Sequence, residues 1–128
     1  MSSAVLDASA LIALFRSEPG AAVVSAAISQ GAVISAVNLS EVVAKLREGG
    51  TPETVARSMV NPLGITIAGF DTDLAYAAGF LRPATCAAGL SFGDRACLAL
   101  AQRLALPALT ADRSWASLSL GITITVVR

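Results

Sequence analysis

Histidine is absent from this chain of 128 residues, and only two cysteines, Cys86 and Cys97, are present. Without histidine, the chain cannot build a Ser-His-Asp or Cys-His nucleophile, a histidine acid–base pair or a histidine-ligated metal site. The two cysteines form no CxxC pair, which argues against a zinc site, and we interpret both as structural. Polar chemistry must therefore use carboxylates, hydroxyls, one lysine and eight arginines.

Charged residues are also scarce. They make up 14% of the chain and sum to a net charge of zero, so a general basic surface that coats nucleic acid is excluded. A nucleic-acid substrate would need local arginines or a metal ion to offset its phosphates. Hydrophobic residues reach 55%, above the usual share of about 45–50%. This surplus predicts that part of the surface is buried against a partner.

Targeting and membrane signals are missing as well. Residues 19–40 carry no charge, but Pro19, Gly20, Asn38 and four serines interrupt any spanning helix. The N-terminus has no basic segment, and Asp7 breaks its apolar stretch, so no signal peptide is expected. We expect a cytoplasmic protein that is one domain over residues 1–128.

Short apolar strands alternate with helical patterns along the chain. This alternation predicts an α/β sandwich with a largely parallel sheet, whose strands are apolar because helices cover both faces. The expected strands are 4–7, 32–35, 64–70, 106–111 and 121–127. The expected helices are 8–15, 21–30, one from Asn38 to about Glu48, 51–60, 71–81 and 91–105, with a loop at 83–89 and a turn near Trp115.

Six acidic residues stand at strand ends or helix starts. In parallel sheets, ligands bind outside the carboxyl ends of the strands, so these acids are candidates for one site. The six are Asp7, Glu41, Asp71, Asp73, Asp94 and Asp112. Carboxylate oxygens suit hard cations such as Mg²⁺ or Mn²⁺.

Helix capping is the competing explanation for each acid taken singly. Ser91 and Asp94 fit a capping box, and Asn38 and Glu41 come close to one. Asp7 and Asp112 are each placed to cap the segment that follows them. Glu41 is also placed to pair with Lys45 one helical turn later. The pattern alone leaves six candidates and does not choose among them.

Four segments together resemble the PIN-domain ribonucleases, and specifically the VapC-type toxins of bacterial type II toxin–antitoxin modules. In chain order they are AVLDASALIALF (4–15), ISAVNLSEVVAKL (34–46), SFGDRACLALA (91–101) and LTADRSW (109–115). The resemblance covers essentially the whole chain, in the family's order and at its spacing. One short motif would be a weak signal, whereas four in sequence are specific.

The resemblance implies a three-layer α/β/α fold with a central, mostly parallel five-stranded sheet. It also implies a pocket that holds Mg²⁺ or Mn²⁺ through Asp7, Glu41, Asp94 and Asp112. We expect Asp7 and Asp94 to bind the metal most directly, Asp112 to support it, and Glu41 to orient or deprotonate a water molecule. The family's sheet order makes the strand before Asp71 an edge strand, which places Asp71 and Asp73 outside the pocket as caps.

Further residues take weaker roles. Ser9 matches a hydroxyl frequent in the family, and Thr110 precedes the last acid by two residues; both are expected to support the metal-binding acids or to be ordinary capping or core hydroxyls. Arg95, Arg113 and Lys45 are candidate contacts for substrate phosphate, with surface ion pairs as the alternative.

The function that the resemblance implies is metal-dependent hydrolysis of RNA by a toxin. The implied partners are an RNA substrate, a VapB-type antitoxin and a second copy of the chain in a homodimer. The alternative from another class is a catalytically idle PIN-like module that binds RNA or protein. Receiver domains and haloacid-dehalogenase phosphatases fit poorly, because Ala8 and Ser9 stand where these families need a second acid.

Overall fold

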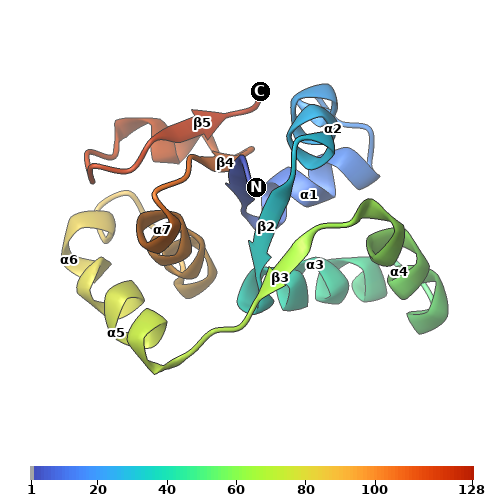
Figure 1. The fold of residues 1–128 in the computed structure, drawn as a ribbon, viewed down its shortest axis with the longest axis horizontal. Helices are drawn as coiled ribbons and strands as arrows, with labels where there is room; N and C mark the ends of the chain where they lie inside the picture. The colour runs from blue at the N-terminus through green and yellow to red at the C-terminus, as the bar shows by residue number, and fades with distance from the viewer. Residues whose placement is uncertain (1) are drawn as a thin grey trace.

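A sheet of five parallel strands lies between two layers of helices in the computed structural model, which describes residues 2–128 (Figure 1). The strand order is β3-β2-β1-β4-β5, and each neighbouring pair is parallel. The strands are β1 (Ala4–Leu6), β2 (Ala32–Ser35), β3 (Thr66–Ala68), β4 (Ala108–Thr110) and β5 (Ile124–Val126). The predicted α/β class and five-stranded sheet are confirmed.

Helices connect the strands and cover both faces of the sheet. One layer holds α1 (Ala8–Phe15), α2 (Ala21–Ser29), α3 (Ala36–Glu48) and α4 (Glu53–Val60), and the other holds α5 (Thr72–Phe80), α6 (Arg82–Thr85) and α7 (Phe92–Leu104) (Figure 1). Two short 3₁₀ helices, η1 (Asn61–Leu63) and η2 (Arg113–Ser117), complete the chain. No helix within residues 2–128 is long and apolar enough to cross a membrane.

The central strands β1, β2 and β4 are buried on both faces because each face has its own core, whereas the edge strand β3 is largely exposed. Val5 packs into the core under α5 and α7, whereas its neighbours Ala4 and Leu6 pack into the core under α1 and α2. This is the two-residue alternation of a strand with both sides covered. Helix α7 is buried from Ala96 to Ala101 without interruption, as expected for a helix enclosed by other elements.

Several predicted elements differ from the structure. The strands predicted at 64–70, 106–111 and 121–127 are only three residues long, at Thr66–Ala68, Ala108–Thr110 and Ile124–Val126. Helix α3 begins at Ala36, not at Asn38, because the Ser35 hydroxyl caps it by accepting the Val37 N–H at 3.2 Å. Asn38 therefore lies inside the helix and is buried. The predicted loop at 83–89 contains the short helix α6, in which the Thr85 hydroxyl donates to the Leu81 carbonyl at 2.9 Å.

Candidate active site

Five carboxylates line one pocket at the carboxyl edge of the sheet: the four predicted site acids, which come from four separate segments, and Glu18, from the loop between α1 and α2. Asp7 follows β1, Asp112 follows β4, Glu41 lies in α3 and Asp94 lies in the first turn of α7. The pocket has a volume of about 360 Å³, and we call it the acidic pocket. Its lining is Asp7, Ala8, Ser9, Ile12, Arg16, Glu18, Glu41, Lys45, Asp94, Ala111, Asp112 and Arg128.

Asp7 is the most buried of the four acids, at 3% exposure. Its Oδ1 accepts the Ala10 N–H at 2.9 Å, so Asp7 does cap α1. The Ser9 hydroxyl donates to Oδ1 at 2.8 Å, and the Thr110 hydroxyl donates to Oδ2 at 2.8 Å. Burial raises the pKa of Asp7 to about 6, and the charge of Asp94 adds to this, although the three hydrogen bonds oppose it. Capping and site membership are therefore not exclusive.

Asp94 and Asp112 likewise each cap a helix and line the acidic pocket. Asp94 forms a capping box with Ser91: its Oδ2 accepts the Ser91 N–H at 2.9 Å, and the Ser91 hydroxyl accepts the Asp94 N–H at 3.2 Å. Asp112 caps η2 by accepting the Ser114 N–H at 2.9 Å. Burial raises the pKa of Asp94, and repulsion from Asp112 adds to it. The capping prediction and the common-pocket prediction hold together.

Glu41 is held in place by two residues. The buried Asn38 Nδ2 donates to Glu41 Oε1 at 2.8 Å and to the Gly93 carbonyl at 2.9 Å, which ties α3 to the start of α7. A Cβ at Gly93 would collide with the Glu41 carboxylate. Glycine is therefore required at this position so that the carboxylate can lie against the α7 backbone. Asn38 and Gly93 together fix the direction of Glu41.

Cys97 is a fully buried residue of α7 whose pKa is influenced by three of the pocket acids. Burial raises the pKa of the Cys97 thiol well above its usual range. The charges of Asp7, Asp94 and Glu41 raise it further, so all three act on one buried point. Cys97 is an inert core residue, as its apolar helix predicts.

The donor set of the acidic pocket suits a hard divalent cation, because it consists of carboxylate and hydroxyl oxygens. Within residues 2–128, no three acidic or cysteine side chains are grouped closely enough to hold an ion by themselves. Mg²⁺ usually keeps several waters and takes only one or two carboxylates directly. Burial is the main cause of the raised pKa values of Asp7 and Asp94, so their charged forms are unfavourable until a cation offsets the lost hydration.

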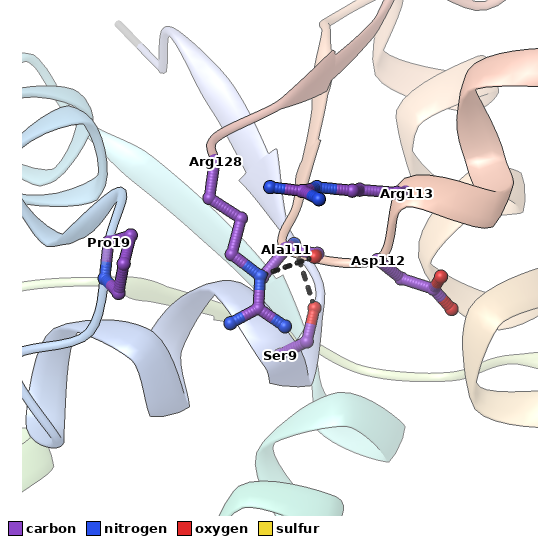
Figure 2. Close-up of a pocket in the computed structure, with 6 residues that line it drawn as sticks. All are labelled: Ser9, Pro19, Ala111, Asp112, Arg113 and Arg128. Atoms are coloured by element: carbon purple, nitrogen blue, oxygen red, sulfur yellow. Dashed lines mark hydrogen bonds between the residues drawn. The ribbon is translucent and has the colours of Figure 1, made fainter.

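Basic residues are divided between the acidic pocket and its surroundings. Lys45 lines the pocket with Arg16 and Arg128. Arg113 lines an adjoining cavity of about 470 Å³, which also includes Ser9, Pro19, Ala111, Asp112 and Arg128 and which we call the arginine pocket (Figure 2). Arg95 lines neither cavity. Its Nη1 donates to the Ala78 carbonyl at 2.9 Å, and its guanidinium lies 5.9 Å from the Phe92 ring centre.

Asp71 and Asp73 lie away from the acidic pocket. They belong to the start of α5, beyond the edge strand β3. Asp71 caps α5 and forms two hydrogen bonds with Arg103, each 2.9 Å long. The edge position that the resemblance implied for β3 is confirmed, and neither residue lines the pocket.

Sequence reasoning missed three residues of the site. Asn38 looked like a helix cap, Gly93 looked like a helix residue without a role, and Arg128 looked like a plain end of the last strand. A glycine in the first turn of a buried helix is the one local signal available, because it indicates a close approach of another group. The sequence does not indicate that Arg128 lies in the same pocket as Asp7. Arg128 reaches the pocket because the preceding strand, β5, pairs with β4.

A family model described as PIN domain matches residues 4–119. None of the curated proteins compared with this chain matches it. The fold resembles that of a DNA-bound VapBC from Salmonella typhimurium, with a TM-score of 0.74, 18% identity and 98% coverage of both chains.

Two further solved structures are similar. A toxin–antitoxin complex from Klebsiella pneumoniae has a TM-score of 0.70 and 22% identity, over 94% of this chain and 96% of the other. Mycobacterium tuberculosis VapC20, a toxin described as cleaving the sarcin-ricin loop, has a TM-score of 0.71 and 16% identity, over 94% of this chain and 98% of the other. At these identities the likeness shows a shared fold.

Proposed function

Because this chain belongs to the PIN domain family, we propose that it is a metal-dependent endoribonuclease that serves as the toxin of a type II toxin–antitoxin pair. The observation that carries the proposal is the convergence of Asp7, Glu41, Asp94 and Asp112 on one pocket. Capping explains Asp7, Asp94 and Asp112 separately, but it does not explain why these three caps and Glu41, which caps no helix, face one cavity. The structures of toxin–antitoxin complexes with the same fold support the assignment.

Asp7 and Asp94 are the residues that would hold Mg²⁺ or Mn²⁺ directly, together with water molecules, and Asp112 would support the ion, with Glu41 at the side of the site. When bound, such an ion lowers the pKa of water and stabilises charge on a phosphodiester. Ser9 and Thr110 hold Asp7 in one orientation through hydrogen bonds of 2.8 Å each. A fixed ligand of this kind loses little entropy when an ion binds.

Glu41 is the residue that we assign to the attacking water. Its carboxylate is half-buried, lines the pocket and is oriented by Asn38 at 2.8 Å. A carboxylate held within reach of a water can accept its proton or align it for attack. Lys45, one helical turn later on α3, also lines the pocket and is assigned to a substrate phosphate. Arg95 is not assigned to substrate, because its guanidinium is engaged with Ala78.

The partner that we propose is a peptide segment of an antitoxin. An apolar groove of about 450 Å³ between α3 and α4 offers a surface for it, lined by Leu39, Val43, Ala56 and Val60. Arg47, Arg57 and Glu53 also line this groove, which leaves one net positive charge to attract an acidic side chain of the segment. For the homodimer we assign the outer face of α5, where Tyr76 and Phe80 are exposed at 63% and 77%.

The test is cleavage of total bacterial RNA by antitoxin-free protein in Mg²⁺, in Mn²⁺ and in EDTA. Wild type is compared with Asp7→Asn and Asp94→Asn, and Asp73→Asn is the matched control because Asp73 lies outside the pocket. We expect discrete products that require metal, a loss of at least about 100-fold in both pocket variants and none in the control.

The opposite results are equally informative. Products that persist in EDTA or in Asp7→Asn would disprove the metal-dependent mechanism. If wild type binds the ion by calorimetry yet cleaves no RNA, two explanations are left: the specific target is missing from the RNA supplied, or the chain is the catalytically idle module that binds RNA or protein.

A further inference from the structure

Arg128 stands at the boundary between the acidic pocket and the arginine pocket and lines both. Its Nε donates to the Ala111 carbonyl at 3.0 Å, which anchors the guanidinium across the end of β4 (Figure 2). Nη1 lies 4.0 Å from Glu18 Oε1, too far for a hydrogen bond. The N–H groups on Nη1 and Nη2 therefore donate to no residue within 2–128. An arginine fixed at one nitrogen presents the others to the cavity.

Arg113 reaches the same cavity from the opposite side. Figure 2 shows its side chain extending over the arginine pocket, while the Asp112 carboxylate turns away from it. Arg113 forms no ion pair with any residue of 2–128. Its backbone is held by η2, which is anchored in the core by the fully buried Trp115. Two guanidinium groups thus face one cavity: Arg113 has no ion-pair partner within residues 2–128, and Arg128 has only Glu18, at 4.0 Å.

The two cavities adjoin each other. They share Ser9, Ala111, Asp112 and Arg128, so a chain that leaves the acidic pocket along this wall enters the arginine pocket directly. The four acids would repel a polyanion, whereas the two arginines attract it. An anion that repeats along a strand, one unit at the metal and the next at the arginines, matches this distribution of charge.

We propose that Arg113 and Arg128 form a phosphate subsite, which holds an RNA phosphodiester adjacent to the one that is cleaved. The inference rests on the proposed function, because it places the RNA strand across the acidic pocket. Guanidinium groups suit this ligand, since they can give two parallel N–H donors to phosphate oxygens. The subsite fixes the direction of the strand and reads no base.

The first experiment measures binding without cleavage. Fluorescence anisotropy of a labelled short uridine oligonucleotide is followed with the full chain in EDTA, from about 20 to about 200 mM KCl. Arg113→Ala and Arg128→Ala are each expected to weaken binding about 5- to 10-fold and to reduce the salt slope by about 0.7, the value for one lost contact to a single strand. Arg128→Lys keeps the slope but binds more weakly. Arg82→Ala, on the exposed helix α6, is the matched control and leaves both unchanged.

Several outcomes would overturn the subsite. Wild-type slopes in both alanine variants would do so, as would an absence of oligonucleotide binding by wild type. Equal, arginine-dependent binding of a glutamate oligopeptide would assign the arginines to a protein partner. Arg113→Ala keeps the test valid if Arg128→Ala misfolds, because Arg113 is exposed and Arg128 also anchors Ala111.

A second experiment separates this inference from the nuclease itself. In Mg²⁺ or Mn²⁺, Arg113→Ala is expected to raise KM for RNA with kcat nearly unchanged, because the contact is made before and during cleavage. If wild type cleaves and this variant cleaves with the same KM, the subsite fails and the nuclease stands. If wild type binds with arginine-dependent slopes yet never cleaves, the nuclease fails and the subsite stands.

Discussion

Asp7 and Asp71 have the same local structure and opposite chemistry. Each follows a parallel strand and caps the next helix, and each accepts the N–H three residues later at 2.9 Å. Burial raises the pKa of Asp7 to about 6, whereas Arg103 lowers the pKa of Asp71 to about 2. The difference comes from position in the sheet, because β1 is the central strand and β3 is an edge strand.

The comparison shows that a helix-capping role does not decide whether an aspartate belongs to a functional site. At the centre of the sheet, a capping carboxylate is enclosed by two cores and meets other carboxylates, so its charge remains uncompensated. At the edge, solvent and an arginine compensate the same group. A binding site for a cation arises in the first environment and not in the second.

Asp7→Asn is the variant with the largest expected effect on stability, because it removes the buried charge that distinguishes Asp7 from Asp71. The pKa of Asp7 is higher in the folded state than its ordinary value of 3.8, so the folded protein loses stability as pH rises from about 4 through about 6. Asparagine caps equally well and carries no charge. In EDTA at pH 7, we expect the variant to gain up to about 3 kcal/mol in free energy of unfolding, the equivalent of roughly two pKa units.

Urea unfolding of wild type and Asp7→Asn between about pH 4 and pH 7.5 measures this gain. The difference between the two proteins should grow with pH and level off above the pKa of Asp7. A variant that is less stable than wild type at pH 7 would show that the carboxylate is not strained by burial, and the environment argued for β1 would be wrong.

A divalent cation should also offset the unfavourable energy of the buried Asp7 charge, by neutralising that charge when it binds. At a concentration about 100 times its Kd, an ion that binds only the folded state adds about 2.7 kcal/mol of stability. We expect Mg²⁺ or Mn²⁺ to raise the Tm of wild type and of Asp71→Asn alike. Asp94→Asn should have a higher Tm than wild type in EDTA and a smaller response to metal, because one repelling ligand is gone. An unchanged metal response in Asp94→Asn would reject the pocket as the ion site.

Gly93 in α7 and Gly79 in α5 allow the same comparison to be made for side-chain packing. A Cβ at Gly93 collides with the Glu41 carboxylate, whereas a Cβ at Gly79 meets no atom within 4 Å. Gly93→Ala should therefore impair cleavage by displacing the Glu41 carboxylate, and should change stability little because that carboxylate is the end of a flexible side chain. Gly79→Ala should raise stability by about 0.5–1 kcal/mol, the helix propensity gain. Thermal unfolding and RNA cleavage are measured for both variants. Equal changes in Tm and in cleavage rate for the two variants would mean that the Glu41 side chain is not held in place.

Much of the fold could be predicted because its signals are local. The central strands are apolar runs with two covered faces, and Ser91 with Asp94 forms the capping box that its spacing indicates. The start of α3 was misplaced, since Ser35 ends a strand and caps a helix with no residue between them. Polar Asn38 therefore took the role of cap in the prediction, whereas its side chain serves a contact to Gly93, 55 residues away.

The candidate site was only partly predictable for the same reason. Local pattern found six acids, and the resemblance selected the four that line one pocket. Which acid is buried depends on the order of strands, and Arg128 enters through the pairing of β5 with β4. Contacts between segments that are far apart in the sequence produce no periodic pattern of residues from which they could be predicted.

Asp71→Asn gives the smallest effect and tests the other half of the comparison. The pKa of Asp71 is lowered to about 2 chiefly by hydrogen bonds from Arg103, so its contribution to stability is present above pH 4 and is lost as pH falls toward 2. The pair is exposed, and salt should screen it. We expect a slightly lower Tm than wild type at pH 7, a difference that shrinks at about 1 M salt and vanishes near pH 2. Thermal unfolding at the two pH values and two salt concentrations measures it. A rise in Tm, as expected for Asp7→Asn, would show that position in the sheet does not separate the two aspartates.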